Sequence, residues 1–281
     1  MTAETAPVLG QWPNAPLVFV LAQVRFHPLA SASPESIREI LTKRVGKEFS
    51  TIVQASAIDI QIKLDAETTI QRSPQTAIGY DMLNGAMDAS IRVVNGAITF
   101  STTTYKDSVG FMARWTEIVG ALEEAEVTLV TRLGLRYVDF ILPRDGKRPE
   151  DYVHAPWNLL GMPALPGAEE TPSMNVSMMD VPYPKGRMRL QFMRGFGVPN
   201  LPADLHGLLP PANRMKTTAP VLCGIIDTDR WIDGNHPADI ATLQTSFVGM
   251  HKDLSGAFRA MTTDAAHKEW QAPPVEQETG K

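Results

Sequence analysis

The sequence predicts an α+β fold in which antiparallel β-sheet is packed by long amphipathic helices. Two Asn-Gly dipeptides, Asn84-Gly85 and Asn95-Gly96, separate three runs of strand-forming residues, and tight antiparallel hairpins favour this dipeptide because it tolerates positive φ. No regular alternation of strand and helix patterns, which would indicate a parallel sheet, is present. Apolar residues at spacings of three and four near the end of the chain predict a helix that covers the sheet.

The chain begins with a predicted strand over the apolar run Leu17–Phe26. Ser33 followed by Pro34 is a helix start signal, because a hydroxyl can cap the first turn and proline loses no hydrogen bond there. Apolar residues at helical spacing then follow: Ile37, Ile40, Leu41 and Val45. Strict alternation over Ile58–Leu64 predicts a half-buried strand.

The two Asn-Gly dipeptides divide a predicted three-stranded meander. Its strands are expected at about Ala77–Leu83, Ala86–Val94 and Ala97–Thr103. Asp107 then resembles a helix N-cap, and the apolar stripe that follows it predicts a helix ending near Ala125.

After this helix, four more predicted strands precede the last helix. A long strand is predicted over Val127–Leu142, two more in Met174–Val181 and Arg187–Phe192, and a buried strand in Val221–Asp229. The longest helix is expected to start at Pro237 or Ala238. Its stripe fits a seven-residue repeat, and we expect it to pack on the chain's own sheet rather than in a dimer.

The domain organisation we expect is two similar sheet-plus-helix halves, residues 16–142 and 143–270, between a flexible N-terminus (1–15) and a disordered tail (271–281). An aromatic residue and an aspartate precede a long helix in both halves, with Tyr105 in the first and Trp231 in the second. Two irregular stretches, 143–172 and 195–220, are rich in proline. Long loops of this kind are often functional.

Composition and charge exclude several classes of protein. The chain is 43% hydrophobic and 20% charged, which is typical of a globular core. A net charge of -5 gives no support to a general nucleic-acid binder. A single cysteine, Cys223, cannot form an internal disulfide. With no signal-peptide pattern and no apolar run of about 20 residues, we expect a cytoplasmic protein without a membrane span.

The densest polar set on a predicted strand is Arg132–Asp139. Strand alternation places Arg136 on the opposite face from Tyr137 and Asp139. Arg136 has three interpretations: a side chain on a solvated sheet face, a partner for an anionic ligand, or a buried arginine paired with a carboxylate from another strand.

Asp227 and Asp229 end the predicted buried strand and share one of its faces. They could hold a divalent cation, as in the Asp-X-Asp motif of sugar-nucleotide transferases, or serve as turn and cap residues. His251 lies beside the apolar stripe of the last helix, where a boundary or core histidine competes with a catalytic one. No His-x-x-x-His or Cys-x-x-Cys pattern occurs, so we expect no metal and no other cofactor.

The central motif Arg132-Leu133-Gly134-Leu135-Arg136-Tyr137-Val138-Asp139 resembles that of a sporadically distributed family of uncharacterised bacterial proteins. Further features are similar: Pro16-Leu17 leading into a strand that ends Arg25-Phe26, Thr103-Thr104-Tyr105 before a helix with Trp115, and Ile226-Asp227 before a helix with His251 and Phe258. This chain has Asp139 where asparagine is usual. The family has no known activity, and its patchy inheritance implies an accessory gene of a defence or conflict system.

These observations predict a non-catalytic binding or interaction protein of such an accessory system. We expect a protein partner, with no nucleic acid or membrane, and a monomer rather than a homodimer. Six methionines between Met162 and Met193 and the proline-rich loops are the regions where we expect that partner. The alternative is an enzyme or small-ligand binder that uses the Asp227/Asp229 strand end with Arg136. No catalytic residue is assigned, and the ligand-binding candidates are Arg136, Asp139, Asp227, Asp229 and His251.

Overall fold

The computed structural model describes residues 12–57, 60–63, 69–72, 76–157, 174–205 and 219–272. The strands are β1 (Leu17–Phe26), β2 (Thr51–Ala57), β3 (Ile60–Lys63), β4 (Thr69–Arg72), β5 (Thr76–Leu83), β6 (Ala89–Val94), β7 (Ala97–Thr102), β8 (Leu129–Ile141), β9 (Asn175–Pro182), β10 (Arg187–Gly197) and β11 (Val221–Pro237). The helices are α1 (Pro34–Val45), α2 (Ser108–Val119), α3 (Ala121–Glu124), α4 (Ile240–Met261) and α5 (Asp264–Gln271). Three short 3₁₀ turns are η1 (Pro149–Tyr152), η2 (Ala155–Trp157) and η3 (Ala203–Leu205).

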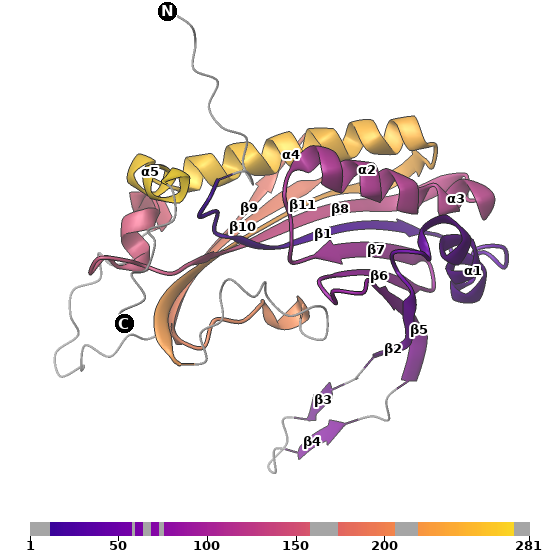
Figure 1. The fold of residues 1–281 in the computed structure, drawn as a ribbon, viewed down its shortest axis with the longest axis horizontal. Helices are drawn as coiled ribbons and strands as arrows, with labels where there is room; N and C mark the ends of the chain where they lie inside the picture. Colours follow the sequence, from indigo (N-terminus) through magenta and orange to yellow (C-terminus); the bar gives the residue numbers. More distant parts are fainter. Residues whose placement is uncertain are drawn as a thin grey trace, which may run out of the picture.

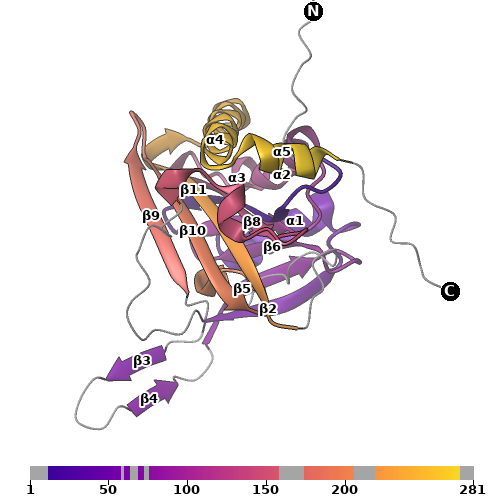
Figure 2. The ribbon, with the colours of Figure 1, turned by 90° about the vertical axis from the view of Figure 1, so that its left-hand side faces the viewer.

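Nine strands form one antiparallel sheet in the order β2-β5-β6-β7-β1-β8-β11-β10-β9. The helices α1, α2 and α4 cover one face of this curved sheet (Figure 1). The view turned by 90° shows α4 and α5 on the same side of β8 to β11 (Figure 2). The predicted α+β class is therefore confirmed. Within the described residues, none of the helices is both long and apolar enough to cross a bilayer.

The sheet is built from two halves of similar topology. In each half a central strand, β1 or β8, pairs with the last strand of a three-stranded meander, β5-β6-β7 or β9-β10-β11, and a helix follows. The halves meet where β1 pairs with β8. By strand pairing β8 groups with β11, β10 and β9, and the expected domain boundary after residue 142 stays a prediction. Sequence patterns mark a strand but do not say which strand pairs with it.

Short polar side chains cap the N-termini of the helices. Ser33 Oγ accepts from the Ser36 amide at 3.2 Å, and Asp107 Oδ1 accepts from the Gly110 amide at 2.7 Å, so both predicted N-caps are confirmed. Asp239 caps α4 in the same way. Helix α4 starts at Ile240 rather than at Pro237, because Pro237 still belongs to β11.

The apolar stripe of α4 lies over β8 and β11 and packs against α2. Its six buried side chains are Leu243, Phe247, Met250, Leu254, Phe258 and Met261. Phe247 meets Trp115 of α2 edge to face, with ring centroids 5.3 Å apart. The prediction that this helix packs on its own sheet is confirmed.

The structure differs from the predicted elements in several places. Within the alternating run Ile58–Leu64 the structure describes β3, which pairs with β4 in a separate two-stranded sheet, and the ends of the run lie outside the described residues. Strand β2 was not predicted. Strand β11 continues eight residues beyond the predicted end at Asp229, to Pro237. At the N-terminus the packed structure already includes Trp12, which is 5% exposed and stacks on Trp270 of α5. Residues 1–11 and 273–281 lie outside the described residues.

The two Asn-Gly dipeptides differ in conformation. Asn95-Gly96 is a two-residue turn between β6 and β7, and Gly96 has φ +74°. Asn84-Gly85 instead begins a longer loop in which Met87 has positive φ and the Asn84 side chain accepts from the Asp88 and Ala89 amides. The meander is confirmed, but the predicted two-residue turn at Gly85 is wrong, because the Asn84 side chain closes the loop.

Gly96→Val is expected to destabilise the fold by about 1 kcal/mol or more, because a β-branched residue resists positive φ. The added Cβ would also lie 2.7 Å from the Phe26 carbonyl oxygen. Gly85→Val has open space and should have little effect. Urea unfolding of both variants measures the difference, and equal stabilities would contradict this assignment of the turns.

Leu254→Ala is expected to lower the free energy of unfolding by about 2–5 kcal/mol, the usual range for truncating a buried leucine. Leu254 is fully buried, whereas Val248 on the same helix is 40% exposed. Val248→Ala is thus the control and should change stability by less than about 0.5 kcal/mol. Chemical denaturation of both variants tests the packing of α4; similar losses would mean that the stripe does not face the core.

Candidate functional site

The sheet face opposite the helices carries a row of alternating charge across four strands. Arg136 of β8 stands beside Asp229 of β11, Asp229 beside Arg189 of β10, and Arg189 beside Asp180 of β9. Residues directly opposite each other in an antiparallel sheet point to the same face, so these four side chains lie together. The register therefore creates a polar surface that chain order does not reveal.

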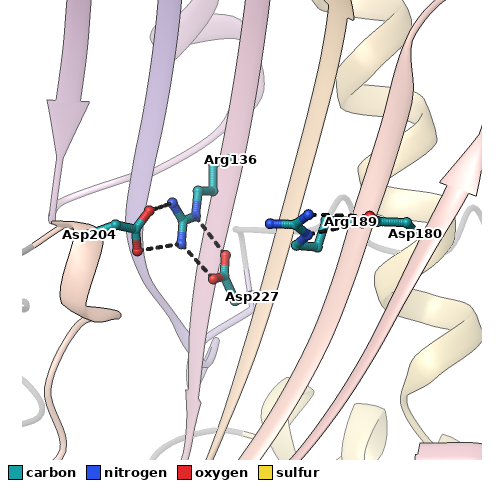
Figure 3. Close-up of polar contacts among 5 residues, drawn as sticks. All are labelled: Arg136, Asp180, Arg189, Asp204 and Asp227. Carbon is teal, nitrogen blue, oxygen red and sulfur yellow. Dashed lines mark hydrogen bonds and ion pairs between the residues drawn. The ribbon is translucent and has the colours of Figure 1, made fainter. Parts of the chain in front are cut away.

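Arg136 binds two carboxylates at once (Figure 3). Its Nε and Nη2 donate to Asp227 Oδ1 and Oδ2 at 2.8 and 2.7 Å. Its Nη1 donates to Asp204, and Nη2 donates to Asp204 Oδ1 at 3.2 Å. The side chains of Arg136 and Asp227 are 13% and 5% exposed. Of the three interpretations of Arg136, a largely buried arginine paired with a carboxylate from another strand is the one observed.

Mutual attraction keeps Arg136 and Asp204 in their ionised forms. Burial alone would lower the pKa of Arg136, but hydrogen bonds and the charges of Asp227 and Asp204 raise it above its usual value. Partial burial opposes ionisation of Asp204, yet its bonds to Arg136 lower the pKa of that carboxyl. Both groups are therefore ionised at neutral pH.

Asp229 is the carboxyl group of this surface without a direct partner. Within the described part of the chain it forms no hydrogen bond or ion pair. The pKa of Asp229 is raised from 3.8 to about 6, mainly because the carboxyl is buried; Arg136 opposes this shift and the charge of Asp227 adds to it. An acid that titrates near neutral pH at a surface hollow is a candidate for ligand binding.

A hollow of about 340 Å³ opens on this face. Its lining residues are Leu21, Gln23, Arg25, Arg92, Thr99, Arg132, Gly134, Arg136, Asp204, Leu205, Asp229 and Trp231. Arg25 donates to Gln23 Oε1 at 2.9 Å, and Gln23 donates to Thr99 Oγ1 at 3.0 Å. The Trp231 ring lies 5.1 Å from the Arg132 guanidinium carbon. The hollow thus has a polar floor formed by neighbouring strands.

The turn η3 closes one end of the hollow. Leu201 and Leu205, before and within this turn, are buried against Phe19, Val138 and Phe140 on the same sheet face. These apolar contacts hold the turn in place, so that Asp204 reaches the outer edge of Arg136.

The five predicted ligand-binding residues lie on two faces. Arg136, Asp227 and Asp229 meet on the uncovered face, whereas Asp139 and His251 lie on the covered face beside Tyr137. The Tyr137 hydroxyl and His251 Nδ1 are 2.7 Å apart, and burial lowers the pKa of His251. The cavity next to them is only about 30 Å³. His251 is therefore a boundary histidine with a hydrogen-bond partner, as one of the two interpretations predicted.

The interpretation of Asp227 and Asp229 as turn and cap residues is wrong, because both lie in the middle of β11. The Arg136 guanidinium lies between Asp227 and Asp204 and donates to both oxygens of each carboxylate. Among the described residues, His, Cys, Asp and Glu side chains form no group of three or more that could hold a metal ion.

Sequence reasoning missed Asp204, Arg25 and Trp231 as members of the site. Asp204 lies in a proline-rich loop, where no periodicity indicates which way a side chain points. Alternation along β1 and β11 could have placed Arg25 and Trp231 on a face, but only the strand register brings them to Arg136.

No protein-family model matches the chain, and no curated protein matches it either. The resemblance of the central motif to a bacterial family stays a prediction.

Asp229→Asn is expected to stabilise the protein at pH 7 by about 1–3 kcal/mol, since a shift of two pKa units corresponds to about 3 kcal/mol. The folded state binds the proton more tightly than the unfolded state, because the folded pKa is about 6 and the ordinary value is 3.8. Stability contributed by the protonated form is present below pH 4 and is lost as pH rises through 6.

Urea unfolding of wild type and Asp229→Asn between pH 4 and pH 7 measures this difference, which should shrink toward zero at the acid end. Asp180→Asn is the control, because Arg189 lowers the pKa of the exposed Asp180, so that variant should gain no stability at pH 7. A constant difference between wild type and Asp229→Asn across the range would show that Asp229 does not titrate near pH 6.

Proposed function

We propose that the chain is a non-catalytic binding protein that binds a protein partner on the uncovered face of its sheet. The observation that supports this most strongly is the 340 Å³ hollow, whose polar lining comes from five strands and from η3. Concave sites with a few convergent polar groups are the usual location of binding in a fold. Helices bury the other face, which leaves this face for recognition.

Exposed apolar side chains beside the charged row favour a protein partner. Met178 on β9 is 60% exposed and shares the uncovered face with Asp227, and Val176 nearby is 39% exposed. Methionine adapts its shape to a partner because its side chain is flexible and polarisable. The charged hollow and this apolar margin together resemble the mixed composition of protein interfaces.

A small-ligand binder or enzyme is the second candidate, and the raised pKa of Asp229 favours it. The size of the hollow also fits a small molecule. The non-catalytic proposal is favoured because the other hydroxyl and carboxylate groups of the described lining are already engaged: Thr99 accepts from Gln23, and Asp204 accepts from Arg136.

The cellular setting that we propose depends on the amino-acid sequence and not on the fold. An accessory bacterial system, of the defence or conflict type, is what the resemblance of the central motif implies. The net charge of -5 favours a protein partner over nucleic acid. We further propose a cytoplasmic monomer, since α4 uses its apolar stripe within the chain.

Gly134→Leu tests the binding face by filling the hollow. The nearest atom to a Cβ at Gly134 is Gln23 Cβ at 3.9 Å, so a side chain can be added at this position without a backbone clash and would extend into the hollow. Gly249→Leu is the matched control, because Gly249 lies on the exposed side of α4 with open space around it. Affinity capture from the native host, followed by mass spectrometry, is expected to recover the same protein with wild type and Gly249→Leu and to lose it with Gly134→Leu.

A partner retained equally by all three proteins would contradict binding at the hollow. A small molecule in native mass spectra of wild type and Gly249→Leu, absent from Gly134→Leu and without a captured protein, would replace this proposal by the small-ligand candidate. Thermal melts of the two variants confirm beforehand that both are folded.

A further inference from the structure

The two carboxylates on Arg136 differ in burial and in origin. Asp227 comes from the middle of β11 and its side chain is 5% exposed, whereas Asp204 comes from the three-residue turn η3 and is 64% exposed. Asp227 alone provides Arg136 with a charge partner across the sheet. Asp204 can therefore leave without exposing Arg136 to the large penalty of an unpaired buried charge.

From this difference we propose that the outer edge of Arg136 is a carboxylate-binding site for an acidic side chain of a protein partner, and that Asp204 occupies it in the free protein. The inference rests on the proposed binding function and names the chemistry that it recognises. The planar donors Nη1 and Nη2 already hold a carboxylate with both of its oxygens. A glutamate or aspartate of a partner offers the same two oxygens in the same plane.

The other cations of the hollow favour an acidic occupant over a basic one. Arg25 donates to the neutral Gln23, and no carboxylate of the described residues pairs with it. Arg132 has its nearest carboxylate, Asp233, at 3.6 Å. A second acidic group of the same partner segment could therefore meet Arg25 or Arg132 while the first lies on Arg136. Arg92, in contrast, is already bound by Asp81 through two hydrogen bonds.

Competition between Asp204 and the partner predicts the effect of removing Asp204. A tethered carboxylate excludes an external one until it is displaced, and a surface ion pair of about 1 kcal/mol corresponds to roughly fivefold in affinity. Asp204→Ala should therefore bind an acidic peptide at least about fivefold more tightly than wild type. Asp204→Asn removes the charge and keeps the size, and should show the same gain.

A matched control exists on the same face. Asp180 accepts from Arg189 Nε and Nη2 at 2.9 and 3.2 Å (Figure 3), but Arg189 does not line the hollow. Asp180→Ala removes one negative charge and frees one guanidinium, as Asp204→Ala does. If the site depends on the hollow rather than on net charge, Asp180→Ala should bind the peptide as weakly as wild type.

The experiment is fluorescence anisotropy with a labelled hexaglutamate peptide, titrated with wild type, Asp204→Ala, Asp204→Asn and Asp180→Ala at low and high salt. Asp204→Ala combined with Arg25→Gln should lose part of the gain, and combined with Gly134→Leu all of it. Equal gains in Asp204→Ala and Asp180→Ala, or no gain in either Asp204 variant, would overturn the proposal. Equal competition by polyphosphate and by unlabelled hexaglutamate would overturn the choice of carboxylate.

The outcomes separate this inference from the proposed function. If Gly134→Leu loses the captured partner but neither Asp204 variant gains peptide affinity, the binding face stands and its recognition of carboxylates is wrong. If the Asp204 variants gain affinity while Gly134→Leu keeps its partner, the carboxylate site exists but does not bind that partner.

Discussion

The ion pair between Arg136 and Asp227 is the interaction on which the uncovered face depends. It joins β8 to β11 next to the junction of the two halves, with both side chains largely buried. Removing one member of such a pair typically costs about 3–5 kcal/mol, because the other is left as an uncompensated charge. The position of Asp204 follows from this pair, and so does part of the high pKa of Asp229, which the Asp227 charge raises.

The two faces of the sheet differ in how their charged groups are paired. On the covered face, charged side chains link the sheet to the elements packed on it. Arg194 of β10 pairs with Glu150 of η1, and Arg230 of β11 donates to Asp253 of α4. Burial of apolar side chains beneath α2 and α4 supplies the main driving force for folding. This leaves the uncovered face free to carry a group such as Asp229, whose ionisation opposes folding at neutral pH. Carboxyl groups whose ionisation opposes folding are common at sites where the residue is selected for binding and not for stability.

Local patterns predicted the elements but not their partners. The strand Leu17–Phe26 and the caps Ser33 and Asp107 are recognisable because they depend on neighbouring residues alone. Alternation also placed Arg136 and Asp139 on opposite faces correctly. Alternation along β10 places Arg194 on the same face as Met188, Leu190 and Phe192, but only the fold reveals that its partner there is Glu150 from a distant turn. Such pairings depend on register and loop paths, and a single sequence does not encode these in any short pattern.

The carboxyl groups already around Arg136 determine how the proposed acidic partner can bind. Arg136 already serves two carboxylates, and Asp229 stands beside it as a third carboxyl group whose ionisation is opposed by the charge of Asp227. A further carboxylate added to this group would be repelled by the carboxylates already beside Arg136. It would be accommodated if Asp204 left, since the number of charges around the guanidinium then stays constant. This surface therefore favours binding by exchange, in which the carboxylate of the partner replaces that of Asp204. Asp204 is the carboxylate that can move away, because it lies in a short, exposed turn.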